Sequence, residues 1–287
     1  MPDIELHQLE RPYGELRIAS PARQRRLLAS LAVEGQQSPV LVVEGGDGRH
    51  VLIDGYQRVT ALEALGRDTV SAIVLPLGEA EALVQWHRQA RSNRRSAMEE
   101  AWLTRVLVEQ HGLDQHEIGR RLGHSQSWVS RRLGLLTALP ESVQELVRAG
   151  RLSPYSATKY LVPMARANAG DCEKLAASLA GHPLTTRQME RLYVAWRSSD
   201  EDGRARLVDR PLLYLRAADE MEQQEPPQPD AALVKDVEVL GAICRRVVRR
   251  LTRRPRALAL PEELTRLWPA ARESMDALRG EMEEKLS

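Results

Sequence analysis

The spacing of apolar positions changes along the chain, and residues 1–78 mix the two periods typical of strands and helices. A run rich in Leu and Ala follows Pro21, a residue that suits the first turn of a helix. A Gly- and Asp-rich segment separates two β-branched runs, as in a hairpin. The predicted strands are 38–43, 50–53 and 69–75, and the predicted helices are 21–34 and 58–65. This region therefore predicts a small α+β domain.

Residues 79–197 have only the helical period, interrupted by Gly and Pro at intervals typical of short helices. This spacing predicts a bundle of about six helices. The next segment is polar and Pro-rich, which predicts a linker with at most one short helix, at 207–221. Helical spacing returns after it. The expected parts are an N-terminal domain at 1–96, a helical domain at 97–197, a linker at 198–230 and a helical C-terminal region at 231–287.

The composition agrees with a mostly helical protein and excludes several other classes. Hydrophobic residues make up 43% of the chain and Phe is absent, which favours helices over an all-β fold. Cys172 and Cys244 lie far apart without a CxxC pair, so we expect two reduced, buried thiols rather than a disulfide framework or a zinc site. The N-terminus lacks the pattern of a signal peptide, and no apolar run reaches the length of a membrane span. We therefore expect a cytoplasmic protein with no membrane partner.

Residues 115–136 (QHEIGRRLGHSQSWVSRRLGLL) have the spacing of two short helices that pack at a steep angle. Gly119 is small where the helices approach, and Gly123 can adopt the left-handed conformation that a tight turn needs. Ser125 is a suitable N-cap for the second helix. The apolar residues expected between the helices are Ile118, Leu122, Val129, Leu133 and Leu136. This combination predicts a helix-turn-helix centred on Gly123.

The second helix leaves a polar outward face whose groups can hydrogen-bond base edges and phosphates. The predicted DNA-binding residues are Ser125, Gln126, Ser127, Ser130, Arg131 and Arg132. The net charge of the chain is only +1, and residues 114–151 hold six arginines against four acidic residues. Uncharged donors must therefore share the phosphate contacts with the arginines. The alternative is an ordinary helical hairpin with a solvated polar face.

These residues and their surroundings resemble the ParB-type partition proteins. GHSQSWVSRRLGLL and the LPESVQELVRAGRLSPYSA that follows are similar to the helix-turn-helix of the family and its next helix. Upstream, IELHQLERPYGELR, GQQSPVLVV and HVLIDGYQRVTALEALG are similar to its N-terminal domain, which has a ParB/sulfiredoxin-like fold. The resemblance covers residues 3–165. It implies an α+β N-terminal domain, then an all-α domain that binds double-stranded DNA. Sulfiredoxin activity is rejected because it needs a reactive Cys, and none lies here.

The resemblance also implies a nucleotide, since ParB N-terminal domains bind CTP through Gly-Glu-Arg-Arg-x-Arg-Ala and use it to close a clamp on DNA. The matching GYQRVTA at 55–61 retains only Arg58 of the three arginines and lacks the Glu. The second motif, Glu-Asn-x-x-Arg, matches SNRRS at 92–96, which retains Asn93 and has arginines one or two positions early. The nucleotide-binding candidates are Gly55, Tyr56, Gln57, Arg58, Asn93, Arg94 and Arg95.

A guanidinium suits paired phosphate oxygens, but the loss of two arginines should weaken triphosphate binding. CTP with Mg is thus the one cofactor that the resemblance implies. The alternative for residues 54–56 is a plain strand-to-helix turn in which Gly55 supplies the unusual backbone angle. We expect weak or absent CTPase activity, no catalytic residue and no metal held by the protein.

A basic stripe follows near the C-terminus, where arginines occur in pairs four residues apart and face an apolar side. The arginines are at positions 245, 246, 249, 250, 253 and 254. The stripe is a second phosphate-binding surface, a solvated face paired with nearby acids, or part of a dimer helix. A homodimer is expected because the ParB family dimerises through its C-terminal domain, although this tail is not visibly similar to that domain.

Three functions compete. The first is a DNA-binding protein of partition or nucleoid-occlusion type, with a Walker-type ATPase as the partner in partition. The second is a transcription regulator that has lost the nucleotide switch. The third is a ParB-like nuclease, which needs clustered carboxylates or histidines around a metal, whereas the chain offers only Asp54 and His50 at the candidate turn.

Overall fold

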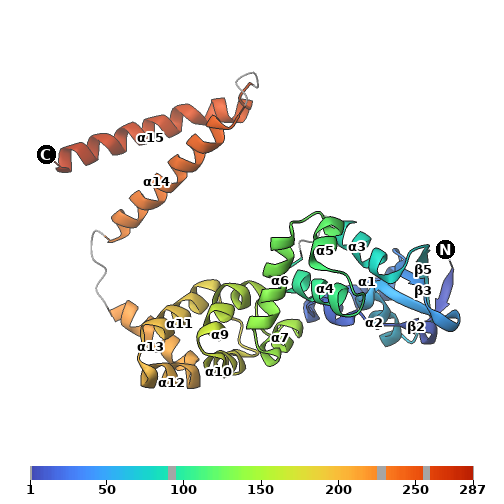
Figure 1. Cartoon of the computed structure of the whole chain (residues 1–287). Coiled ribbons are helices and arrows are strands. Elements are labelled where there is room, and N and C mark those ends of the chain that lie inside the picture. Colours follow the sequence, from blue (N-terminus) through green and yellow to red (C-terminus); the bar gives the residue numbers. More distant parts are fainter. Residues whose placement is uncertain (1, 90–94, 225–230, 255–258, 287) are drawn as a thin grey trace. The chain divides into compact units, whose positions relative to one another are not determined.

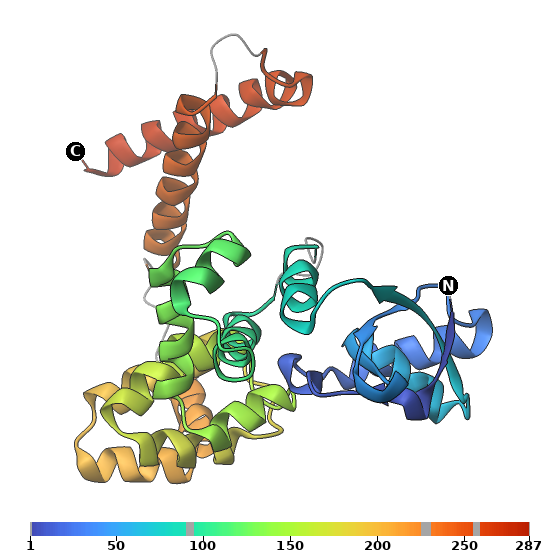
Figure 2. The same cartoon turned by 45° about the vertical axis from the view of Figure 1, so that its right-hand side comes forward.

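The computed structural model describes residues 2–89, 95–224, 231–254 and 259–286. The chain divides into two compact units, residues 1–221 and 222–287. The first unit begins with a mixed five-stranded sheet and continues as a series of helices (Figures 1 and 2). The second unit consists of two long helices. The expected α+β fold with helical domains after it is confirmed.

The sheet has the strand order β1-β5-β3-β4-β2. β3 pairs antiparallel with β4, as the predicted hairpin requires, and parallel with β5. At the edges, β1 pairs antiparallel with β5, and β2 pairs parallel with β4. The strands are β1 (Asp3–Glu5), β2 (Leu9–Glu10), β3 (Val40–Glu44), β4 (His50–Asp54) and β5 (Thr69–Leu75).

Both faces of the sheet are covered. α1 (Pro21–Glu34) and α2 (Tyr56–Ala64) lie on one face, and α3 (Glu79–Gln89) lies on the other. Successive strand residues point to opposite faces, so β3 and β4 contribute to both cores. The residues on the α1–α2 side are Val40, Val42 and Leu52, and those on the α3 side are Val43, Val51 and Ile53.

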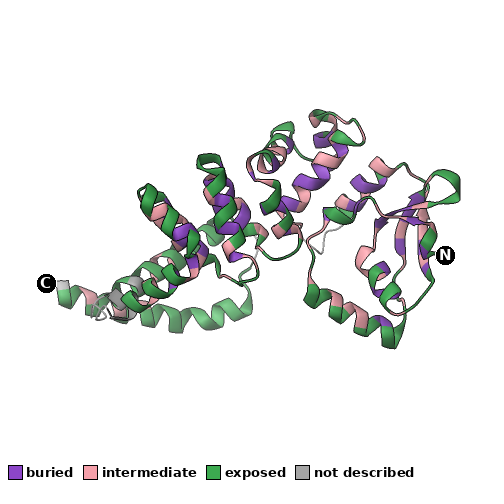
Figure 3. Cartoon of the chain, turned by 90° about the horizontal axis from the view of Figure 1, so that it is seen from below, coloured by how far each residue is buried: buried purple, intermediate pink, exposed green. Residues whose placement is uncertain are grey.

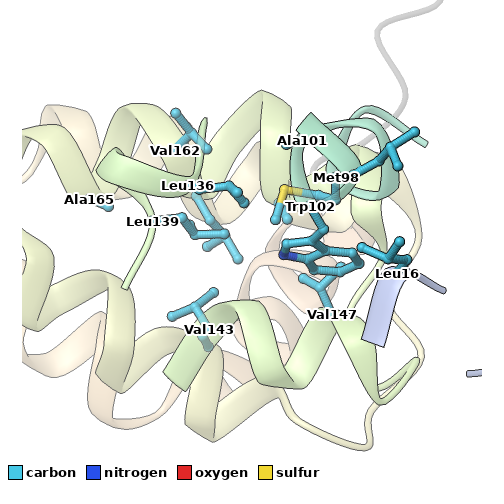
Figure 4. Close-up of a cluster of buried hydrophobic side chains, with 14 of the residues drawn as sticks. Leu16, Met98, Ala101, Trp102, Leu136, Leu139, Val143, Val147, Val162 and Ala165 are labelled. Atoms are coloured by element: carbon cyan, nitrogen blue, oxygen red, sulfur yellow. The ribbon is translucent and has the colours of Figure 1, made fainter. Parts of the chain in front are cut away.

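The helical part of the first unit shares its core with the α3 side of the sheet. Its centre is Trp102, which is fully buried (Figure 4). Trp102 Nε1 donates to Gln144 Oε1 at 3.1 Å. The Gln144 amide nitrogen donates in turn to the carbonyls of Leu136 and Leu139, so this buried amide has the partners that burial demands. The helices are α4 (Ala97–Glu109), α5 (Gln115–Leu122), α6 (Gln126–Ala138), α7 (Glu141–Arg148), α8 (Pro154–Ser156), α9 (Val162–Ala167), α10 (Ala169–Leu179) and α11 (Thr186–Ser198).

The expected linker at 198–230 differs from the structure over its first part. Two further helices, α12 (Glu201–Asp209) and α13 (Pro211–Gln224), pack on the bundle, and Leu207, Val208 and Leu215 are buried there. Asp200 accepts from the Gly203 amide and caps α12. The polar sequence at 198–204 is thus the end of α11 and the outer face of α12, whereas residues 225–230 of the expected linker lie outside the described residues.

The second unit contains α14 (Ala231–Thr252) and α15 (Glu262–Leu286), whose apolar side chains remain largely exposed (Figure 3). Val248, Leu267 and Trp268 each expose more than half of their surface. Among the described helices, none is both long enough and apolar enough to cross a bilayer. Of the two free cysteines, Cys172 is buried as expected, whereas Cys244 on α14 is only half-buried.

Candidate nucleic-acid interface and adjoining cavity

The helix-turn-helix forms as predicted from α5 and α6. Gly123 ends α5 in the left-handed conformation, with φ of 75°, and the Ser125 hydroxyl accepts from the Trp128 amide at 3.2 Å. A Cβ at Gly119 would lie 2.8 Å from the His124 carbonyl oxygen, so only glycine fits there without displacement of the turn. All three local predictions are confirmed.

The apolar residues between the two helices are buried with one exception. Ile118 and Val129 are wholly inaccessible, and Leu122 and Leu136 are nearly so. Leu133, predicted to be buried, is only half-buried because it lies at the margin of the α6 contact surface. The buried residues of α6 are therefore Val129 near its start and Leu136 near its end.

Five of the six predicted DNA-binding side chains are exposed on α6 or at its cap, namely Ser125, Gln126, Ser127, Ser130 and Arg131. The Arg131 guanidinium has no hydrogen-bond or ion-pair partner within the described part of the chain. Arg132 differs, because its Nε donates to Glu100 Oε2 at 2.7 Å and its guanidinium lies 4.8 Å from the Trp128 ring centre. Arg132 therefore holds α6 against α4.

Aromatic side chains connect the turn of the motif with α3. The His124 ring stacks on Trp128 with the ring centres 4.0 Å apart, and the His87 ring meets His124 edge-on at 6.5 Å. Burial, helped by the charge of Arg95, lowers the pKa of His87 to about 4. At neutral pH His87 is thus an uncharged packing residue.

A cavity of about 860 Å³ opens beside the start of α2, between α1, the segment that precedes β3, the end of β4 and Trp86 of α3. Its charged lining residues are Arg17, Arg23, Arg26, Asp54, Arg58 and Glu99. The volume lies in the range of small-molecule sites. Four of the predicted nucleotide-binding residues line it, namely Gly55, Tyr56, Gln57 and Arg58.

Gly55 turns the chain from β4 into α2 with φ of 106°. A Cβ at this position would lie 2.5 Å from Val40 Cγ1, so the backbone angle and the packing both require glycine. The neighbouring Asp54 accepts from Trp86 Nε1 at 2.9 Å and from Arg58 Nη2 at 3.1 Å. The turn is therefore fixed from both sides of the cavity.

Arg58, the retained motif arginine, is occupied by protein groups. Its Nη1 donates to the carbonyls of Ser38 and Pro39 at 2.9 and 2.6 Å, and its Nη2 pairs with Asp54. Burial lowers the pKa of this guanidinium, and the Asp54 charge opposes that shift. Arg58 lies at the wall of the cavity and ties β3 to α2.

Tyr56 stands where the family motif has Glu, and it too has a structural role. Its hydroxyl donates to the Leu52 carbonyl at 2.8 Å and accepts from the Tyr13 amide at 2.9 Å. Burial raises the pKa of the Tyr56 phenol, so it stays protonated. The Gln57 carbonyl accepts from Gln24 Nε2 at 3.1 Å, which joins α2 to α1.

The second set of candidates is only partly within the described residues. Asn93 and Arg94 lie outside them. Arg95 lies over the Trp86 ring at 3.6 Å and donates through Nη2 to the Trp86 carbonyl at 3.2 Å. Burial, followed by repulsion from Arg17, lowers the pKa of Arg95 to about 10. Arg17 also lies over this ring, at 4.4 Å.

Comparison with known proteins divides the first unit into the sheet region and the helical region that follows it. Residues 2–86 match the family described as the ParB N-terminal domain, and residues 93–198 match the ParB HTH domain. The chain belongs to the ParB-type family. The first match ends within α3, and the second begins before α4.

Curated relatives share part of the chain. It is 34% identical over 180 residues to the chromosome-partitioning protein ParB of Myxococcus xanthus, covering 61% of this chain and 58% of the relative. It is 34% identical over 120 residues to the nucleoid occlusion protein of Geobacillus kaustophilus, covering 42% of each. The chain thus spans about half the length of these relatives.

Among solved structures, C-terminally truncated ParB of Caulobacter crescentus complexed to the centromeric parS site is 26% identical. The match covers 68% of this chain and 99% of that one, with a TM-score of 0.33. The same protein complexed with CTP-gamma-S is matched over 62% of this chain and 97% of that one, at 26% identity with a TM-score of 0.29.

Inspection of the ParB motifs alone missed three arginines of the cavity, Arg17, Arg23 and Arg26. Arg23 and Arg26 lie three residues apart on α1, on one face of that helix. This spacing is visible in the sequence, but the sequence does not show that the face borders the Gly55 turn.

Metal-ligating side chains do not gather at the cavity within the described residues. The part of the chain that is described contains no group of three His, Cys, Asp or Glu residues able to share an ion. Of the two carboxylates at the cavity, Asp54 is bonded to Trp86 and Arg58. Glu99 is bonded to Ser96 in a capping box and lies 3.6 Å from Arg17.

Proposed function

We propose that the first unit binds duplex DNA through α6, as a DNA-binding protein of partition or nucleoid-occlusion type. The observation that carries the proposal is the row of exposed donors at the start of α6, beside a turn that Gly119 and Gly123 keep tight. An α-helix fits the major groove, where its first turns reach base edges. Arg131 suits paired acceptors of guanine, and Gln126 suits adenine.

The test is binding of a selected duplex site by variants of this face. Arg131→Ala should weaken specific binding by about 1–3 kcal/mol if its guanidinium contacts a guanine. Arg166→Ala is the matched control, because Arg166 is an exposed arginine on α9, outside the helix-turn-helix. The assignment is wrong if Arg131→Ala and Gln126→Ala both bind the site as the wild type does.

We further propose that the cavity beside Gly55 binds the nucleotide that the family motif implies, CTP. Support comes from its volume and from four arginines in its wall. The same residues fit a metal or a hydrolytic reaction poorly, because Asp54 and Glu99 are both engaged and Tyr56 replaces the motif Glu. CTP would supply the polyphosphate charge, and the protein would bind it without efficient hydrolysis, Mg entering only with the phosphates.

Calorimetry with CTP tests this proposal directly. Binding at micromolar to submillimolar concentration, followed by CTP-dependent retention on closed DNA, would favour a partition protein, and a search for a Walker-type ATPase partner would follow. DNA binding without any response to CTP would favour the transcription regulator. Metal-dependent nicking of a plasmid would instead indicate a nuclease.

For the second unit we propose a homodimer formed by α14. Its apolar side chains recur at intervals of four and three residues, the repeat of a coiled coil, and comprise Leu233, Val237, Leu240, Cys244, Val247 and Leu251. In an antiparallel pair of α14 helices centred on Ile243, Asp236 of each subunit would lie beside Arg250 of the partner subunit. This gives two pairs of opposite charge beside the apolar seam. Most of the arginine stripe would remain on the outer face.

Oxidative cross-linking distinguishes the two directions of α14. A parallel pair places Cys244 beside the partner's Cys244, so the wild type would form a covalent dimer. An antiparallel pair places Cys244 in a layer with the partner's Leu240, so only Leu240→Cys should cross-link. A monomeric mass in light scattering, with no cross-link in either protein, would refute the dimer.

A further inference from the structure

The wall of the cavity holds two pairs of arginines with different surroundings, and the inference that follows rests on the proposed nucleotide site. Arg58 lies on α2 and Arg17 lies over Trp86 of α3, whereas Arg23 and Arg26 lie on α1. The carboxylates of the wall are Asp54 and Glu99. The pairing of each arginine decides which charge is available to a ligand.

The first pair is already neutralised. Arg58 forms an ion pair with Asp54 at 3.1 Å. Its other terminal nitrogen donates to the carbonyls of Ser38 and Pro39, just before β3. Arg17 lies 3.6 Å from Glu99 Oε1, and its guanidinium stacks over Trp86. Contact of either guanidinium with a phosphate would compete with these protein partners.

The second pair is free. The side chains of Arg23 and Arg26 are exposed and make no hydrogen bond or ion pair with another residue in the ranges that the structure describes. They lie three residues apart, so one face of α1 presents both to the cavity. Arg25, between them in sequence, does not line the cavity.

α1 is held in place to present this face. The Ser20 hydroxyl accepts from the Arg23 amide and caps the helix, and Gln24 Nε2 donates to the Gln57 carbonyl at 3.1 Å. The latter bond joins α1 to the α2 segment that lacks two motif arginines. The two unpaired cations therefore face the place where the family motif would supply positive charge.

We propose that Arg23 and Arg26 bind the phosphate chain of the nucleotide, in place of the motif arginines absent at Gln57 and Thr60. Two forked guanidiniums from one helix face match the paired oxygens of a polyphosphate. Arg58 is then a positioning residue, which fixes the Gly55 turn through Asp54 and β3. The free charge of the cavity comes from α1.

Calorimetric titration of the full chain with CTP, CMP and inorganic tripolyphosphate tests the assignment. The double variant Arg23→Gln/Arg26→Gln should bind CTP and tripolyphosphate about a hundredfold more weakly, about tenfold for each charged contact. CMP should be bound almost equally by both proteins. Arg25→Gln on the same helix should behave as the wild type, and circular dichroism should confirm that all variants are folded.

The outcomes separate the two proposals. If the wild type binds CTP and the double variant binds it equally well, the α1 arginines are a solvated face and the inference is wrong, while the nucleotide site stands. If the wild type binds tripolyphosphate but not CTP, and the double variant loses it, the arginine site is supported and the nucleotide rejected. If the wild type binds neither, both proposals fail.

Discussion

Gly119 and Gly134 provide a matched pair of substitutions that tests the packing of the helix-turn-helix. Both glycines lie inside helices, at α5 and α6 respectively. At Gly134 a Cβ would meet no atom within 4 Å, whereas at Gly119 it would lie 2.8 Å from the His124 carbonyl oxygen. The two Gly→Ala changes thus add the same methyl group and differ only in the room that the surrounding atoms leave for it.

The magnitudes follow from this difference. Alanine in a helix is favoured over glycine by about 1 kcal/mol, so Gly134→Ala should raise the free energy of unfolding by about that amount. At Gly119 the same gain is opposed by an overpacking cost of about 1–3 kcal/mol. Relief is difficult because the His124 amide donates to the Gly119 carbonyl at 2.8 Å and holds the turn in place. Gly119→Ala should be less stable than Gly134→Ala by about 1–3 kcal/mol.

Urea and thermal unfolding of the full chain, followed by circular dichroism, measure these changes. For a unit of this size the difference between the variants corresponds to about 2–12 °C in Tm. Gly119→Ala should also weaken binding to the selected duplex, because displacement of the turn moves Ser125 and Gln126. Equal stability of the two variants, with unchanged DNA affinity, would refute the tight approach of α5 and α6.

Three further outcomes are expected. Val129→Asp should unfold the helix-turn-helix in a thermal melt, since it buries an unpaired charge, whereas Ser130→Asp on the exposed face should melt as the wild type does. Because burial lowers the pKa of His87 from 6.5 to about 4, the unfolded chain takes up a proton first as the pH falls. The free energy of unfolding should therefore decline as the pH falls from 6.5 to about 4. The decline should be smaller in His87→Gln than in the His182→Gln control. If the arginine stripe on α14 contacts phosphates, replacing Arg245, Arg249 and Arg253 by Gln should reduce the slope of log affinity for DNA against log salt concentration by up to about three. An unchanged slope would exclude that contact.

Local signals were sufficient to predict the helix-turn-helix and the hairpin of the sheet. Gly123 and Ser125 act on their immediate neighbours, through a left-handed backbone and a hydroxyl that accepts from an amide three residues on. The β-branched runs likewise became β3 and β4 within two residues of their expected bounds. Features whose cause lies within one or two turns of chain can be inferred from sequence.

Long-range packing set the features that the sequence did not predict. The polar stretch at 198–206 predicts a linker and residues 207–221 at most one short helix, but residues 201–209 form α12, whose Leu207 and Val208 are buried against α10. Leu133 has the correct helical spacing for burial, yet it lies at the edge of the surface that α6 buries. The period of a helix gives the direction of its apolar side, but the width of the buried surface depends on which elements cover it.

The cavity shows the same limit at the level of charge. A motif assigns a role to Arg58 by its position, but the availability of a guanidinium depends on its partners, and here Asp54, Ser38 and Pro39 occupy it. Arg23 and Arg26 belong to no motif, and among the described residues their guanidiniums have no such partners. Since a phosphate is attracted by uncompensated charge, the free arginines of α1 are better placed to bind it than the retained motif arginine. In a ParB-type domain that has lost motif arginines, the ion pairing of the arginines around the cavity therefore indicates its ligand better than the motif residues that remain.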